Sequence, residues 1–152
     1  MNKQIEIIKK TRIYLLEQIK DLSTEQLNKI PEGFNNNIIW NLGHMVATQQ
    51  GICYRRAGLP IYIEENIWES YHSGTSPGAF VDAAAIDNIK YLMATTIDQL
   101  EIDLDKGISN YTPWTTRYDV ELKSLEDAVN FLPYHEGLHC GCIMALKRLV
   151  IQ

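Results

Sequence analysis

The chain of 152 residues has few of the features that mark secreted or membrane proteins. It contains only three cysteines, Cys53, Cys140 and Cys142, an odd number without the spacing of a disulfide framework, so reduced thiols are expected. No apolar run approaches the roughly 18 residues of a membrane span, and the charged first ten residues lack the apolar core of a secretory signal. We therefore expect a cytoplasmic protein with no membrane partner.

Positive charge is also scarce. The chain has 14 lysines and arginines against 19 acidic residues, which gives a net charge of −5. Non-specific binding of nucleic acid requires basic residues that neutralise phosphates, so no nucleic-acid partner is expected. The sequence also lacks a Ser-His-Asp arrangement and a glycine-rich phosphate loop with its lysine. The sequence therefore indicates neither a catalytic triad of this kind nor a phosphate-binding loop.

What the sequence does contain is helical periodicity. Apolar residues recur at three- and four-residue steps, which predicts amphipathic helices over residues 3–21, 38–57, 82–104 and 124–149. Ser23 followed by Gln26 predicts a short capped helical turn after the first helix. The length suits a single domain spanning residues 1–152. Together these features predict an all-α fold, a four-helix bundle with a long crossover loop.

Two connections between the expected helices are long. Residues 59–80 read as a loop with a Gly/Ser/Pro-rich turn, and a connection of this length is often a lid or a binding loop. Its residues Trp68, Tyr71 and His72 could close over a ligand, or they could simply pack the crossover against the bundle. A second irregular piece covers residues 110–120, of which 114–120 could be extended.

Two histidines mark the last expected helix as chemically interesting. His135 and His139 are four residues apart, which places both side chains on one helix face, about 6 Å apart along the axis. His44 lies on the second expected helix, and if the two helices pack together three imidazoles converge. Three protein ligands leave coordination positions open, as in catalytic metal sites. The alternatives are a solvated stripe, which the apolar neighbours argue against, and histidines bonded to ordinary polar partners.

Residues near the histidines have open roles at this stage. Pro133 predicts either two successive helices or a kink, or an irregularity that packing absorbs. Cys142 could approach the metal as a soft ligand, although packing of a small thiol is favoured. Asn41 and Glu136 could orient the ligands or lie on the surface.

Three aromatic residues close to the histidines also have two interpretations. Trp40, Phe131 and Tyr134 could form the wall of a pocket around the metal. Aromatic residues at helical spacing are also common in ordinary cores. The sequence does not choose between the two.

Two short segments of the sequence resemble those of a known protein family. Residues 38–45, IIWNLGHM, and residues 134–143, YHEGLHCGCI, resemble the DinB/YfiT-like superfamily of small metal-binding helical bundles, and the order of elements agrees over nearly the whole chain. The resemblance implies that His44, His135 and His139 bind one divalent metal ion, zinc or nickel. It also implies a homodimer. One departure is Cys142, which stands where the superfamily usually has glutamine.

Three functions are compatible with these observations. The resemblance favours a metal-dependent enzyme similar to transferases that use low-molecular-weight thiols, or a hydrolase, with a small-molecule substrate that could be such a thiol. The second is a non-catalytic metal-binding or sensing module. The third is a structural homodimeric bundle whose histidines bond carboxylates or carbonyls.

Overall fold

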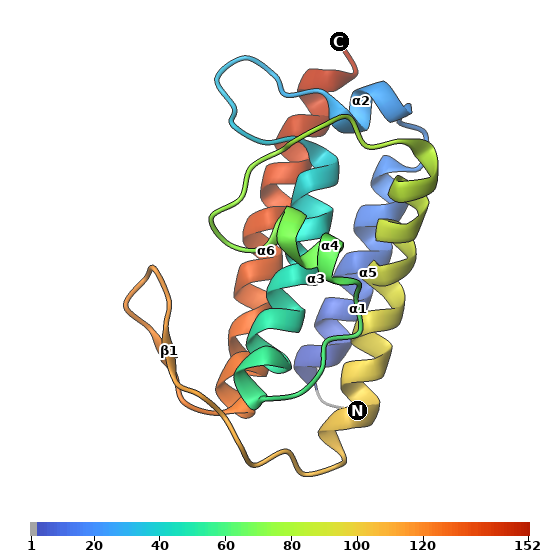
Figure 1. Ribbon diagram of the computed structural model, residues 1–152. Helices are drawn as coiled ribbons and strands as arrows, with labels where there is room; N and C mark the ends of the chain where they lie inside the picture. Colours follow the sequence, from blue (N-terminus) through green and yellow to red (C-terminus); the bar gives the residue numbers. More distant parts are fainter. Residues whose placement is uncertain (1–2) are drawn as a thin grey trace.

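The computed structural model describes residues 3–152, and its main feature is a bundle of long helices (Figure 1). The elements in chain order are α1 (Lys3–Ile19), α2 (Thr24–Asn28), α3 (Ile38–Cys53), the 3₁₀ helix η1 (Arg55–Ala57), α4 (Glu65–Tyr71), α5 (Ala83–Leu104), β1 (Trp114–Thr115), β2 (Glu121–Leu122) and α6 (Leu125–Val150). The predicted all-α class is confirmed. None of the helices in the described range has the length and hydropathy required to cross a lipid bilayer.

The four long helices α1, α3, α5 and α6 form the bundle, and each packs against two of the others. In Figure 1, α1 and α6 run in one direction, and α3 and α5 run in the other. Because α3 and α5 are parallel neighbours, the chain between them must return along the bundle, about 24 Å for the 16 residues of α3. This topology is the physical reason for the long crossover.

The crossover is more ordered than the sequence suggests. The expectation of a loop throughout residues 59–80 is wrong, because α4 occupies Glu65–Tyr71. This helix packs on α3 where α3 has two glycines. A Cβ atom at Gly43 would lie 2.5 Å from the Tyr71 ring, and one at Gly51 would lie 2.8 Å from the Trp68 ring. The two glycines therefore make room for the aromatic side chains that hold α4 in place.

Capping side chains set several helix boundaries where the sequence places them. Ser23 and Gln26 form the expected capping box at α2, and Asn37 Oδ1 accepts the Trp40 backbone N–H at 2.8 Å to start α3. The expected helix over 38–57 ends earlier, at Cys53, and continues as η1 before Gly58 adopts a positive φ of 70°.

Pro133 lies inside α6, which runs without interruption from Leu125 to Val150. The interpretation of two successive helices is therefore wrong. Ser124 caps the start of α6 by accepting the Asp127 backbone N–H at 3.1 Å. The segment carrying His135 and His139 is thus a single helix, which keeps their side chains in a fixed relation.

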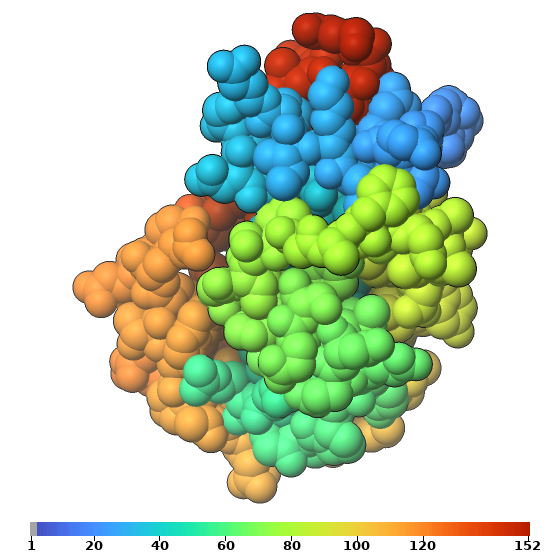
Figure 2. Space-filling model, turned by 45° about the horizontal axis from the view of Figure 1, so that its top comes forward, coloured from blue at the N-terminus to red at the C-terminus, as the bar shows by residue number. Residues whose placement is uncertain are grey.

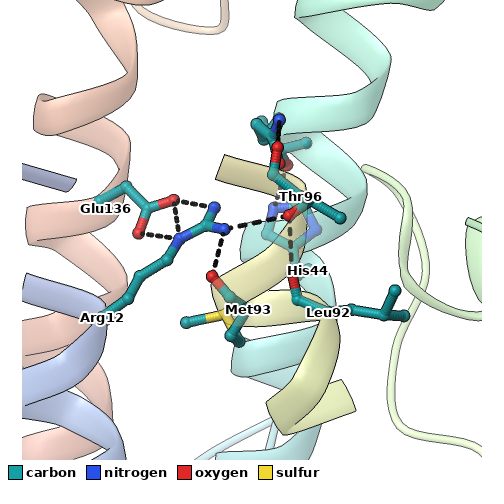
Figure 3. A network of polar contacts seen from close by, with 8 residues as sticks. Arg12, His44, Leu92, Met93, Thr96 and Glu136 are labelled. Atoms are coloured by element: carbon teal, nitrogen blue, oxygen red, sulfur yellow. Dashed lines mark hydrogen bonds and ion pairs between the residues drawn. The ribbon is translucent and has the colours of Figure 1, made fainter. Parts of the chain in front are cut away.

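A buried ion pair joins the helices in the interior (Figure 3). Arg12 of α1 is 1% exposed and donates from Nη2 to Glu136 Oε1 of α6 at 2.6 Å. The same guanidinium donates to the Met93 carbonyl of α5 at 2.9 Å, and Gln49 of α3 donates to the Thr96 carbonyl of α5 at 3.1 Å. All four long helices therefore contribute to one polar network.

Candidate metal centre

Three histidines meet between the adjacent helices α3 and α6. His44 comes from α3, and His135 and His139 come from successive turns of α6. One nitrogen from each ring lies within 4.8 Å of the others, and the ring centroids are 4.5–5.2 Å apart. The structure thus brings together the three side chains that the sequence singled out.

The orientation of His44 is fixed by the crossover. Its Nδ1 lies 2.7 Å from the backbone carbonyl oxygen of Tyr71, the last residue of α4. Because a carbonyl oxygen only accepts, Nδ1 carries the proton and Nε2 keeps its lone pair. The Thr48 hydroxyl lies 3.3 Å from that Nε2, one helical turn further along α3.

The orientation of His139 is fixed by Asn41. The Asn41 side-chain amide donates to the Asn37 carbonyl at 2.7 Å, which turns its oxygen Oδ1 toward His139 Nδ1, also at 2.7 Å. His139 Nδ1 is therefore the donor, and Nε2 again keeps a lone pair. Asn41 orients a candidate ligand, which settles the role that the sequence left open.

His135 supplies the test of whether a metal ion fits. Its Nδ1 atom is buried and has no hydrogen-bond partner among residues 3–152. A buried polar atom without a partner is costly and uncommon in native proteins. An ion bound by the three imidazoles would give this ring a polar partner, so the donor set and its environment fit a metal ion.

The histidines are held in the neutral state that metal ligation requires. Burial lowers the pKa of His44, and it lowers the pKa of His139 to about 4, with a further contribution from the charge of His44. Burial, followed by the charges of His139 and His44, lowers the pKa of His135 to about 2. At neutral pH the three rings therefore have lone pairs that could bind a divalent cation.

A cavity of about 450 Å³ surrounds the three rings. Trp40 stacks on His44 with centroids 4.7 Å apart, and Phe131 lies 6.3 Å from His135. Tyr134 is half exposed and packs on Tyr118 instead, so only two of the three aromatic candidates line the cavity. Figure 2 shows a hollow between the orange segment around the hairpin and the green segment around α4.

Several functional contacts were missed from the sequence. Arg117, in the turn between β1 and β2, lines the cavity, and its charge contributes to the lowered pKa of all three histidines. Nothing in an irregular segment signals that placement. Thr48 could have been found, since it follows His44 at the four-residue spacing. His44 contacts the backbone carbonyl of Tyr71, so no side chain in the sequence could have indicated this contact.

Other candidates lie outside the cluster. His72 stacks on Trp68 at 5.4 Å and does not join the other histidines. Cys142 Sγ lies 3.7 Å from Asn36 Oδ1 and packs against the core rather than joining the three histidines, in agreement with the packing role that the sequence favours. Glu136 is buried against Arg12, so it neither orients a ligand nor lies on the surface.

Comparison with known proteins agrees with this geometry. A family profile described as the DinB superfamily matches residues 7–143, a range that contains both histidine-bearing segments. The chain belongs to the DinB superfamily. A search of curated proteins found no significant match to this DinB-superfamily chain. Members of the superfamily are generally associated with metals, and the histidine triad could hold an ion in this one.

Proposed function

We propose that this DinB-superfamily protein binds one divalent metal ion, zinc or nickel, through His44, His135 and His139. We further propose that it is a metal-dependent enzyme acting on a small molecule. The observation that carries the proposal is the convergence of three neutral imidazoles from two helices in a cavity of about 450 Å³. The reaction class that we propose is transfer to or from a low-molecular-weight thiol, in the cytoplasm.

The residues around the triad support this proposal by holding the rings in one state. The Tyr71 carbonyl and the Asn41 amide oxygen bind the Nδ1–H groups of His44 and His139, which leaves both Nε2 lone pairs for a ligand. Acceptors in these positions also increase the basicity of the ligating nitrogen. The orientation of these two ligands is therefore set before any ion enters.

The remaining walls suit a small anionic nucleophile. His44, His135 and His139 would hold the ion by three nitrogens, which would leave coordination positions open, and the bound ion would lower the pKa of a thiol or water there and so supply a nucleophile near neutral pH. Trp40 and Phe131 contribute apolar walls to the cavity. Arg117 adds positive charge, which favours anions over neutral molecules.

The proposed metal binding is tested by measuring the metal content of the wild type and of a triad variant. Protein purified without a histidine tag should contain close to one equivalent of metal by elemental analysis. His139→Ala should abolish stoichiometric binding in calorimetry, whereas His72→Ala, outside the cluster, should bind as the wild type does. Equal metal content in His139→Ala would refute the assignment.

Access of a thiol to the ion tests the second step. Titrating cobalt-substituted protein with mercaptoethanol should produce a new visible absorption band, because a thiol that binds cobalt changes its spectrum. An unchanged spectrum with cobalt bound would refute the thiol-dependent enzyme and support a metal-binding module without turnover.

A further inference from the structure

A second cavity, of about 460 Å³, adjoins the one around the histidines. Both cavities are lined by Thr48, Ser73 and Trp114, so they form one continuous depression that runs from the triad along α3 to η1. The far part lies between α4, which contributes Trp68, and the segment that contributes Trp114. The Thr112 backbone N–H donates to the Arg56 carbonyl at 2.6 Å and fastens this segment to η1.

The charge inside this depression is opposite to that of the whole chain. Three of the five arginines of the sequence, Arg55, Arg56 and Arg117, line the two cavities, and no aspartate or glutamate lines either one. The whole chain carries 19 acidic residues and a net charge of −5. This separation of charge selects for an anionic occupant.

Arg56 is the arginine available to bind such an occupant at the far end. Arg55 already binds Glu65, with Nη2 2.6 Å from Oε2, and lies over the Trp68 ring at 4.3 Å. The Arg56 guanidinium lies 5.7 Å from the centroid of Trp114, and it makes no ion pair with a carboxylate in the described range. Its planar set of N–H donors matches a carboxylate or a phosphate.

The length of the depression limits the size of the ligand. From His44 to Cys53, the last residue of α3, the helix rises about 13 Å, and Arg56 follows in η1. Because the side chain of Arg56 is long, its guanidinium can lie closer to the triad than its backbone does. The two ends of a bound molecule would therefore be on the order of 10 Å apart.

We propose that the substrate is an elongated small molecule with an anionic oxygen group at the end remote from the metal, and that Arg56 binds this group. Trp68 and Trp114 contact the intervening chain. The metal end of this proposal rests on the proposed function, whereas the anion-binding end does not. Carboxylate and phosphate share the required chemistry, and the experiment separates them.

Binding to metal-free protein tests the anion-binding end alone. All three tryptophans of the chain line the depression, so tryptophan fluorescence should report occupancy. Octanoate and octyl phosphate should each bind at least about tenfold more tightly than octanol, the gain expected of a charge-assisted hydrogen bond. The tighter of the two identifies the preferred anion.

Substitutions of arginine identify the binding residue. Arg56→Gln should remove the advantage of the anion over octanol, and Arg56→Lys should keep part of it, since the charge remains without the planar donors. Arg148→Gln is the matched control, because it changes the net charge equally but lies in the last turn of α6 and lines neither cavity. Near-UV circular dichroism should be unchanged in all three variants.

Two results would overturn the proposal. One is equal binding of octanoate, octyl phosphate and octanol to the wild type. The other is an equal loss in Arg56→Gln and Arg148→Gln, which would show that only the overall charge matters. Either result leaves the metal assignment intact, because no metal is present in this experiment.

Cobalt-substituted protein tests the connection between the two ends. Mercaptooctanoate should bind about tenfold more tightly than mercaptooctanol, and Arg56→Gln should remove this difference. Mercaptopropionate is too short to reach Arg56 from the metal, so Arg56→Gln should leave its affinity unchanged. A similar loss for the short and the long acid would refute the placement of the anion at Arg56.

Discussion

At the scale of single residues, the candidate metal centre depends on two hydrogen-bond acceptors as much as on its histidines. Tyr71 and Asn41 determine which nitrogen of His44 and His139 carries the proton. Without them each ring could adopt either tautomer or rotate, and part of the population would present an N–H group to the ion. The acceptors thus give two of the three rings, His44 and His139, a defined tautomer and orientation.

Removing the acceptor of His139 should weaken metal binding. We expect Asn41→Leu to lower zinc affinity about 10- to 100-fold, since His139 Nδ1–H would then be left without its acceptor. A competition titration with a chromophoric chelator measures this change. Asn41→Asp keeps an acceptor oxygen but loses the donor to the Asn37 carbonyl, so its affinity should be higher than that of Asn41→Leu. Wild-type affinity in Asn41→Leu would mean that the amide has no orienting role.

The buried histidines also predict a pH dependence of stability in metal-free protein. Burial lowers the pKa of His139 to about 4 from the ordinary value of 6.5. As pH falls below about 6.5 the unfolded chain binds protons that the folded protein does not, so the free energy of unfolding decreases. The loss should approach about 1.4 kcal/mol per pH unit for each such histidine.

Urea denaturation at a series of pH values measures this loss. The window between about pH 6.5 and 5 isolates the histidines, because carboxylates with lowered pKa values contribute mainly below about pH 4. His139→Ala should reduce the slope in this window. A slope that is the same in the wild type and in His139→Ala would contradict the prediction.

At the scale of elements, the docking of α4 on α3 decides whether His44 is correctly oriented. Gly43→Ala would place a methyl group 2.5 Å from the Tyr71 ring, so α4 must shift and carry the Tyr71 carbonyl with it. We expect lower zinc affinity in this variant, measured by calorimetry. Gly137→Ala is the matched control, since a Cβ there meets nothing within 4 Å.

The two glycine substitutions should also differ in stability. Alanine is favoured over glycine in an open helix by up to about 1 kcal/mol, so Gly137→Ala should be neutral or stabilising and should bind zinc normally. If Gly43→Ala also binds zinc normally, the position of α4 does not control the site.

The polar network between the helices should be sensitive to loss of one partner. Glu136→Gln would leave the Arg12 guanidinium buried without its carboxylate, which we expect to cost about 3–5 kcal/mol of unfolding free energy. Chemical denaturation measures the change. Glu17→Gln removes a carboxylate from an exposed pair with Lys20 and should change stability by less than about 1 kcal/mol. Comparable stability of the two variants would contradict the prediction.

Elements with a strong local signal could be predicted from the sequence, and elements without one could not. Periodicity predicted the four long helices, and the Ser23–Gln26 cap predicted where α2 begins. The seven-residue α4 is too short to show a period, and Glu64 at its N-cap makes no side-chain capping bond. Its position follows from contacts with Gly43 and Gly51 that only the fold creates.

The residues of the candidate site also separate into those that the sequence could predict and those that it could not. The triad could be predicted because His135 and His139 share a helix face and because the two phrases resemble a known family. The burial of Arg12 could not, since an arginine in an amphipathic helix normally lies on the surface. Arg117 and Trp114 reach the cavities from an irregular segment, and their placement depends on how the hairpin packs rather than on any local pattern.

At the scale of the whole molecule, we predict a homodimer. The neighbouring helices α1 and α5 expose large apolar side chains, among them Ile13 at 67%, Tyr91 at 65% and Ile102 at 58%. Such exposed apolar surface is characteristic of interfaces, and a second copy related by twofold symmetry could cover it. Sedimentation velocity should give the mass of two chains at tens of micromolar, and a monomer at that concentration would remove the prediction.

If the proposed ion is bound, the contact between the Tyr71 carbonyl and His44 links metal occupancy thermodynamically to motion of the crossover. If the ion prefers the tautomer that this carbonyl stabilises, detaching α4 from the bundle must also weaken the ion's hold, by the same free energy in either direction. The crossover would then be held more firmly on the bundle when the ion is bound than when it is absent. Withdrawal of such an ion would thereby also loosen the segment whose residues Ser73, Gly74 and Thr75 line the cavity.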